Sequence, residues 1–194
     1  MWIIRDIENF SEDLMTTIVV DFIKKKLYTD SRVSWTTYGT PKWLQWLVLD
    51  ISDDKFKYND HQQKYWRCNR LGSDVIITGT GSLSEIREFV KRVEAGSKKP
   101  QSVLKSSEVM VIYTTPKLCV HSYTNNKDKP KVCYATNTGR LIAGSGSETF
   151  KLMADHTNFT TEEIFDIVKK EDRATGGKVV EVDLSGRQFN EDVF

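Results

Sequence analysis

The sequence is poor in cysteine, has no long apolar run and carries almost no net charge. Its three cysteines among 194 residues lack Cys-x-x-Cys spacing, which argues against a disulfide framework and against a structural zinc site. No apolar stretch approaches the roughly 20 residues that a membrane-spanning helix needs. A formal net charge of +1 gives no electrostatic reason to expect nucleic acid or a membrane surface as a partner. We therefore expect a cytoplasmic protein in a reducing setting, without a metal ion or another cofactor.

The sequence contains enough apolar material for one domain with a buried core. Hydrophobic residues make up 39% and charged residues 28%, which is typical of a globular chain. Helices are expected at about 82–94, 147–155 and 160–172. Strands are expected at 17–22, 27–29, 46–51, 75–78, 109–113, 118–123, 132–135, 141–143 and 179–182. Blocks of strands separated by blocks of helices predict an α+β fold, with antiparallel sheets and helices outside them.

Three of these segments carry clear local signals. Residues 16–29 are expected to form a hairpin. The helix at 82–94 has one apolar face, and either Ser82 or Ser84 is its candidate cap. Thr160 and Glu163 have the spacing of a capping box at the start of the last helix. The segments 79–82 and 97–107 are expected to be a turn and a loop.

Common phosphate and metal motifs are incomplete in this chain. Gly176-Gly177-Lys178 is not a phosphate loop, because Val179 follows the lysine and the segment leads into a strand. The Gly-x-Gly pairs at 79–81 and 144–146 each open a helix, which suits an anion, but neither has dinucleotide spacing. The three histidines are not at metal-ligand spacing. None of these features defines a site.

Four features stand in a characteristic order along the chain. They are Met15-Thr16-Thr17-Ile18-Val19-Val20, Asp30-Ser31-Arg32, the apolar strand and Gly-x-Gly-Ser of residues 75–82, and a final pair at 143–147 and 172–177. In this order they resemble the catalytic β-subunits of the proteasome family. The similarity is strongest to the peptidase subunit of the bacterial ATP-dependent two-component protease, and it runs from Thr16 to Leu184.

The resemblance implies a four-layer αββα sandwich of the N-terminal nucleophile hydrolase type, acting as a threonine endopeptidase. Thr16 would be the nucleophile, since an N-terminal threonine joins a hydroxyl to an α-amine whose pKa of about 8 suits a base. Asp30 would hold a lysine beside that amine, and the Gly81 N–H would be the oxyanion donor. A second polar group near the amine would comprise Ser145, Asp172 and Thr175.

Two residues compete for the role of the active-site cation. Lys64 is the first candidate, because the family's lysine also precedes an alternating apolar strand. Arg67 is the rival, because its distance from Gly79 fits the family spacing better, although an arginine stays charged and cannot shuttle protons. The resemblance further implies polypeptide substrates, a homo-oligomeric ring and an unfoldase ATPase as partners.

Residues 1–15 decide whether Thr16 can act, since its amine must be free. They are expected to be a propeptide removed by self-cleavage, or a mis-assigned extension ahead of a start at Met15, with 16–194 as the peptidase domain. If they stay attached, the alternative is a catalytically silent structural or inhibitory subunit. An amidase on the same fold is a third possibility. The segment between Asp30 and Lys64 is longer than in the family, with extra residues around 36–60.

Overall fold

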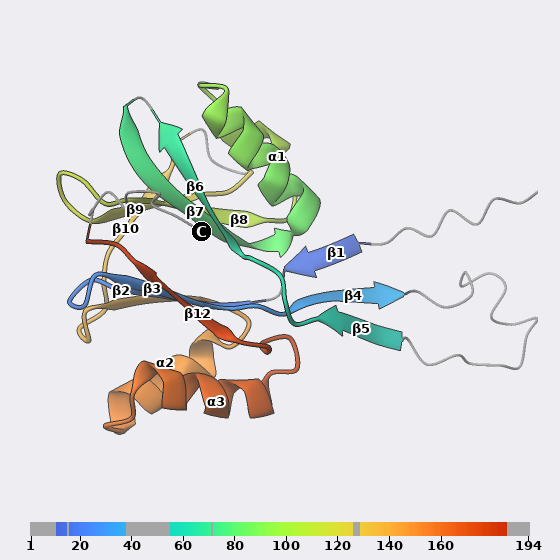
Figure 1. Cartoon of the computed structure of the whole chain (residues 1–194), viewed down its shortest axis with the longest axis vertical. Coiled ribbons are helices and arrows are strands. Elements are labelled where there is room, and N and C mark those ends of the chain that lie inside the picture. The colour runs from blue at the N-terminus through green and yellow to red at the C-terminus, as the bar shows by residue number, and fades with distance from the viewer. Residues whose placement is uncertain (1–10, 15, 38–54, 71, 126–128, 186–194) are drawn as a thin grey trace, which may run out of the picture.

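The computed structural model describes residues 11–14, 16–37, 55–70, 72–125 and 129–185. Within these residues every strand pair is antiparallel, and the strands form two sheets flanked by helices (Figure 1). The predicted α+β class is therefore confirmed. No helix in this part of the chain is long and apolar enough to cross a membrane.

The larger sheet has the strand order β10-β9-β8-β7-β1-β4-β5, with β6 also paired to β7. Its strands are β1 (Ser11–Leu14), β4 (Val33–Thr37), β5 (Lys55–Asn59), β6 (Tyr65–Arg70), β7 (Ser73–Ser82), β8 (Glu108–Tyr113), β9 (Cys119–Tyr123) and β10 (Lys131–Cys133). The smaller sheet has the order β11-β2-β3-β12. Its strands are β2 (Thr17–Asp21), β3 (Lys26–Asp30), β11 (Arg140–Gly144) and β12 (Val179–Asp183).

Three apolar clusters connect the helices and sheets. Helix α1 (Leu83–Glu94) packs on the larger sheet through its predicted apolar face, and a short 3-10 helix, η1 (Pro100–Val103), follows it. A second cluster joins the two sheets, with Ile18 and Val20 of β2 packed with Ile76 and Ile112. Helices α2 (Ser147–His156) and α3 (Thr161–Glu171) pack on the smaller sheet. Figure 1 shows α1 on one side of the molecule and α2 with α3 on the other.

Strand β2 is buried along its whole length because both of its faces are covered. Ile18 and Val20 face the larger sheet, whereas Val19 joins the cluster under α2 and α3. A strand covered on both faces needs a continuous apolar run rather than an alternating pattern. The Thr-Ile-Val-Val sequence supplies that run, and the predicted hairpin of β2 with β3 is confirmed.

Several local predictions agree with the structure. The capping box is present: the Thr160 hydroxyl accepts from the Glu163 N–H, and the Glu163 side chain accepts from the Thr160 N–H. Ser82 occupies the N-cap position of α1, but its hydroxyl pairs with the Ser84 hydroxyl at 2.8 Å and caps no backbone group. The predicted loop at 97–107 contains η1.

The predicted turn at 79–82 is wrong, because β7 continues through Ser82. Gly79 and Thr80 pair with β8, and Gly81 and Ser82 pair with β1. Pairing on the two edges of β7 thus overrides the weak strand preference of glycine.

Strand β1 was not predicted, and it lies between β4 and β7. Leu14 pairs with Gly81 on one edge, while Ser11 pairs with Thr36 on the other. The predicted strand at 46–51 lies outside the described residues.

Candidate active site

Thr16 lies immediately before β2 and is fully buried. Its carbonyl accepts a hydrogen bond of 3.1 Å from the Ser145 N–H, just after β11 ends. Gly144 makes this approach possible, since a Cβ there would overlap the Thr16 carbonyl and its φ of +96° is one that glycine tolerates. The glycine at the end of β11 therefore fixes the backbone of Thr16.

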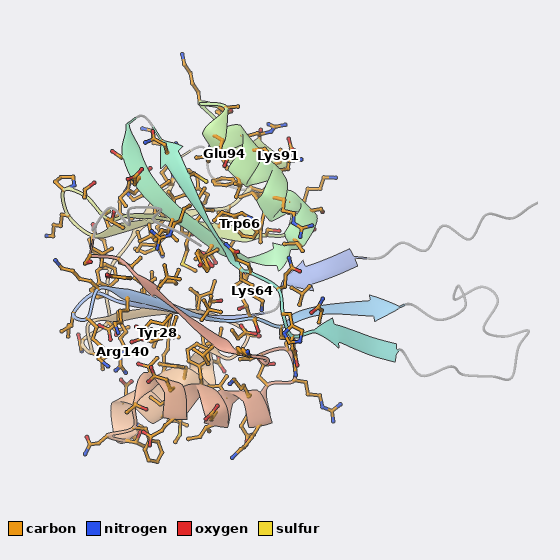
Figure 2. All side chains as sticks on the ribbon, viewed as in Figure 1. Tyr28, Lys64, Trp66, Lys91, Glu94 and Arg140 are labelled. Atoms are coloured by element: carbon orange, nitrogen blue, oxygen red, sulfur yellow. The ribbon has the colours of Figure 1, made fainter. Side chains whose placement is uncertain are left out.

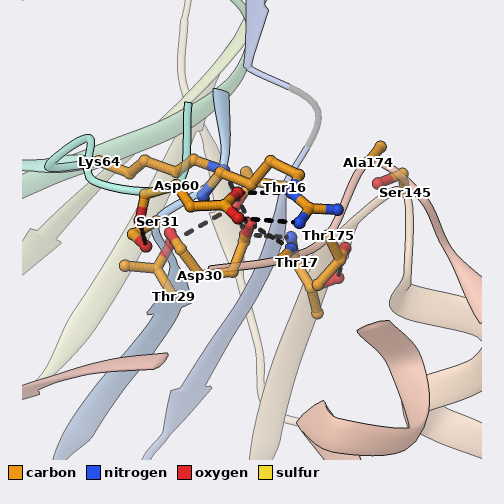
Figure 3. Close-up of polar contacts among 12 residues, drawn as sticks. Thr16, Thr17, Thr29, Asp30, Ser31, Asp60, Lys64, Ser145, Ala174 and Thr175 are labelled. Carbon is orange, nitrogen blue, oxygen red and sulfur yellow. Dashed lines mark hydrogen bonds and ion pairs between the residues drawn. The ribbon is translucent and has the colours of Figure 1, made fainter. Parts of the chain in front are cut away.

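Asp30 ends β3 and organises the centre of the site (Figure 3). Its Oδ1 accepts hydrogen bonds from the Thr16 hydroxyl and, at 3.1 Å, from the Thr17 N–H. Its Oδ2 accepts from the Gly176 N–H at 3.0 Å and from the Arg32 N–H at 3.2 Å. Backbone N–H groups from three segments of the chain thus orient the Asp30 carboxylate.

Lys64 also contacts Asp30, from the region between the two sheets (Figure 2). It lies just before β6, and its Nζ is 3.0 Å from Asp30 Oδ2 with both side chains fully buried. Burial lowers the pKa of Lys64, although the Asp30 carboxylate acts in the opposite direction. The Arg67 side chain is exposed on β6. The geometry thus places Lys64 against Asp30.

A second polar group surrounds Thr17, the neighbour of Thr16. The Thr17 and Thr175 hydroxyls lie 2.7 Å apart, and Thr175 donates to Asp172 Oδ2 at 2.7 Å. The Ser145 hydroxyl donates to the same Asp172 oxygen at 2.6 Å. Asp172 therefore contacts both Ser145 and Thr175, the other two residues predicted for the second polar group. Their connection to Thr16 runs through Thr17 and the Ser145 backbone.

Gly81 of β7 pairs with β1, the strand that precedes Thr16. It is the partner of Leu14, two residues before Thr16, and its φ is +108°. A Cβ on Gly81 would lie 2.7 Å from Ser107 Cα, so the position accepts only glycine without rearrangement. A second glycine, Gly79, packs equally closely, since a Cβ there would lie 2.6 Å from the Glu108 carbonyl oxygen.

Sequence reasoning assigned no role to an ion pair that ties the site's loops together. Arg32 donates to Asp60 at 2.6 and 3.0 Å, and also to the Arg173 carbonyl at 3.1 Å. The Ser31 hydroxyl donates to the Asp60 carbonyl. Arg32 belongs to the Asp-Ser-Arg motif, but Asp60 carries no sequence signal, because it lies in the segment considered an insertion.

The described arrangement places a hydroxyl, a carboxylate and a buried lysine in hydrogen-bonding contact. A hydroxyl beside such a pair is a candidate nucleophile. No group of three or more metal-ligating side chains occurs among the described residues.

The fold has relatives among solved structures. A eukaryotic HslV from Trypanosoma brucei matches with a TM-score of 0.50 and 12% identity, covering 86% of this chain and 98% of that one. The Anbu complex of Pseudomonas aeruginosa, whose structure is a helical assembly, matches with a TM-score of 0.54 and 12% identity, covering 86% and 80%. Anbu of Yersinia bercovieri, described as an ancestral β-subunit, matches with a TM-score of 0.51 and 10% identity, covering 86% and 80%.

These likenesses establish the architecture of the chain. It has the fold that HslV and Anbu share, and the match extends over most of its length. No family model matches the sequence, and no curated protein matches it. At 9–12% identity the likeness concerns the fold, so the roles of the residues rest on the geometry of this chain.

Proposed function

We propose that this chain is a threonine peptidase subunit of the proteasome type, with Thr16 as its nucleophile. The observation that carries the proposal is the contact of the Thr16 hydroxyl with Asp30, whose carboxylate also binds the buried Lys64. A buried lysine is rare unless it is paired. Here the partner of Lys64 is the Asp30 carboxylate, which also contacts the hydroxyl of Thr16, the residue just before β2. The proposed chemistry needs these three groups side by side.

In the proposed reaction, the Thr16 Oγ attacks the carbonyl carbon of a peptide bond. Its proton passes to the Thr16 α-amine, and the Lys64 ammonium favours the neutral form of that amine. The Gly81 N–H stabilises the oxyanion. The C–N bond then breaks, the leaving amine takes the proton, and an ester remains on Thr16. A water molecule hydrolyses this ester and regenerates the hydroxyl.

The amine must first be released, because the Thr16 nitrogen forms a peptide bond with Met15. We propose that residues 1–15 are a propeptide removed by the same hydroxyl. Attack of Thr16 Oγ on the Met15 carbonyl carbon would break the C–N bond and transfer the acyl group to oxygen. Hydrolysis of that ester would leave Thr16 with a free amine and Met15 with a free carboxylate.

The placement of β1 supports both a propeptide and a peptide substrate. Residues 11–14, which end two residues before Thr16, extend antiparallel to β7 at Gly81 and to β4. Main-chain pairing to two strands binds an extended peptide with little regard to its side chains. Once β1 is removed with the propeptide, the edges of β4 and β7 that it paired with become available to a peptide substrate. The scissile bond of that substrate would follow the paired segment.

The likeness to HslV and Anbu supports the wider proposal. In this wider proposal, the chain folds as a four-layer αββα sandwich of the N-terminal nucleophile hydrolase type. It assembles into a homo-oligomeric ring in the cytoplasm, and an unfoldase ATPase is its partner. The Anbu structure of Pseudomonas aeruginosa is a helical assembly, which makes self-association a reasonable expectation for the same fold.

Mass spectrometry and peptide hydrolysis test the proposal together. We expect the mature chain to begin at Thr16, and the Thr16→Ala variant to keep its N-terminal residues and to cleave no fluorogenic peptide. Thr136→Ala, at an exposed threonine before the end of β11 that lies opposite to Gly144, is the matched control and should behave as wild type.

Two results would contradict the proposal. Equal peptide cleavage by wild type and Thr16→Ala would exclude Thr16 as the nucleophile. A wild-type chain that always keeps residues 1–15 and cleaves nothing would favour the silent structural subunit.

A further inference from the structure

Gly81 is held from behind by Ser107, a residue with no role in the proposed reaction. Ser107 is 4% exposed and lies just before β8. Its hydroxyl oxygen accepts a hydrogen bond of 2.9 Å from the Ser82 N–H, the amide next to Gly81. The Ser107 backbone also fills the space that a Cβ of Gly81 would need. One serine therefore contacts both residues that end β7.

Ser107 is itself fixed by Glu85 in the first turn of α1. A single carboxylate oxygen, Oε2, accepts from the Ser107 hydroxyl at 2.8 Å and from the Lys105, Ser106 and Ser107 N–H groups at 2.9, 3.2 and 3.2 Å. Burial raises the pKa of Glu85, but these hydrogen bonds outweigh it and lower the pKa overall. The carboxylate is thus a charged acceptor at neutral pH, which strengthens each hydrogen bond it receives.

The two edges of β7 explain why this contact matters for Gly81. Backbone pairing with β8 extends as far as Thr80 and Glu108. Beyond this pairing, on the same edge of β7, the Ser107 hydroxyl accepts the hydrogen bond from the Ser82 N–H. Leu14 of β1 is the register partner of Gly81 on the other edge, so the Gly81 backbone lies beside the segment that leads to Thr16.

We propose that Glu85 and Ser107 act as positioning residues that orient the Gly81 N–H toward the carbonyl oxygen attacked by Thr16. Neither residue touches the reacting atoms. The proposal rests on the proposed peptidase function, and it deepens that function by naming what preorganises the oxyanion donor. An oxyanion donor stabilises the transition state only if its direction is fixed in advance, because reorienting it during the reaction costs free energy.

Kinetics of Ser107→Ala and Glu85→Gln test the proposal. A misaligned oxyanion donor weakens transition-state binding more than substrate binding, so we expect kcat to fall about ten- to a hundredfold while KM changes about twofold or less. Ser106→Ala and Glu88→Gln, on exposed neighbouring positions, are the matched controls and should retain wild-type kcat. A kcat for Ser107→Ala within twofold of Ser106→Ala would overturn the proposal.

Amide hydrogen exchange of the full-length chain gives a second reading that does not depend on activity. We expect the Gly81 and Ser82 amides to exchange faster in Ser107→Ala and Glu85→Gln, measured at a temperature where both variants are folded. Unchanged exchange in both variants would overturn the positioning role. If wild type cleaves no peptide while amide exchange changes as expected, Glu85 and Ser107 hold the end of β7 in place, but their catalytic role fails together with the proposed function.

Discussion

The Nζ of Lys64 lies 3.0 Å from Oδ2 of Asp30, and neither side chain is exposed to solvent. A buried ion pair forms at a large desolvation cost, which is offset only when hydrogen bonds satisfy the remaining atoms. Asp30 meets that condition, because backbone N–H groups of Thr17, Arg32 and Gly176 all donate to it. The burial of Lys64 therefore depends on Asp30, and the burial of the Asp30 charge depends on Lys64.

A double-mutant cycle on this pair should show strong coupling. Lys64→Met and Asp30→Asn each leave one buried partner uncompensated, and we expect each to lower the free energy of unfolding by about 3–5 kcal/mol. The double variant should lose less than the sum of the two single losses. Urea unfolding measured by circular dichroism provides the values.

The pair of Glu88 and Arg92 on α1, whose side chains are 48% and 40% exposed, is the control for this cycle. Neutralising either of its members should change the free energy of unfolding by about 0.5 kcal/mol or less. Additive losses at Lys64 and Asp30 would mean that the two groups do not interact as the geometry indicates.

The two candidate cations can be separated by activity. We expect Lys64→Ala to abolish peptide hydrolysis, because Asp30 then has no ammonium to place beside the Thr16 amine. Arg67→Ala should retain activity within about twofold, since the Arg67 side chain is exposed. Both variants are assayed at a temperature where circular dichroism shows that they are folded. The reverse pattern would transfer the role to Arg67.

The bridge through Thr175 should tolerate serine but not valine. Its buried hydroxyl lies 2.7 Å from both the Thr17 hydroxyl and Asp172 Oδ2. Valine keeps the shape and removes the bridge, which leaves two polar groups short of a partner and costs about 1–3 kcal/mol of stability. We expect Thr175→Ser to keep most of the activity and Thr175→Val to lose most of it. Equal activity of the two variants would show that the bridge is dispensable.

Asp60 should contribute stability that disappears in acid. The hydrogen bond from Arg32 lowers the pKa of Asp60 below its usual 3.8 despite partial burial. The carboxylate of Asp60 therefore binds a proton more weakly in the folded protein than in the unfolded chain. Its contribution to the free energy of unfolding is fully present above the pKa of the unfolded chain, and it is lost as the pH falls through the lower pKa of the folded protein. The difference in unfolding free energy between wild type and Asp60→Asn should therefore shrink below pH 3.8.

Chemical unfolding at a series of pH values checks this expectation. Asp155→Asn, on the exposed surface at the end of α2, is the matched control and should show a small difference from wild type. A difference for Asp60→Asn that grows as the solution becomes more acidic would contradict the assigned role of the Arg32 ion pair.

Local sequence signals predicted much of the fold. The capping box at Thr160 and the apolar face of α1 follow from spacing alone, because both depend on residues within one or two helical turns. The grouping of Thr16, Asp30 and Lys64 came instead from the order of motifs. Residues 14 and 48 positions beyond Thr16 cannot be brought to one point by any local rule, and only the family pattern indicated it.

The features that were missed depend on pairing between distant segments. Strand β1 has an acidic sequence, Ser-Glu-Asp-Leu, with little intrinsic preference for a strand. It is extended because β4 and β7 offer it hydrogen-bonding partners. Likewise, Asp60 finds Arg32 across 28 positions of the chain. Such contacts are decided by tertiary structure, which propensity and periodicity do not contain.

Strand β1 also joins parts of the larger sheet that have no other pairing with each other among the described strands. The order β7-β1-β4 means that losing residues 11–14 would divide this sheet into a five-stranded part, β6 to β10, and the ribbon of β4 and β5. An isolated two-stranded ribbon is only marginally stable in water. A chain that begins at Thr16 would therefore have a loosened ribbon at the edge of its larger sheet, and an extended peptide entering the gap would restore a continuous sheet around itself.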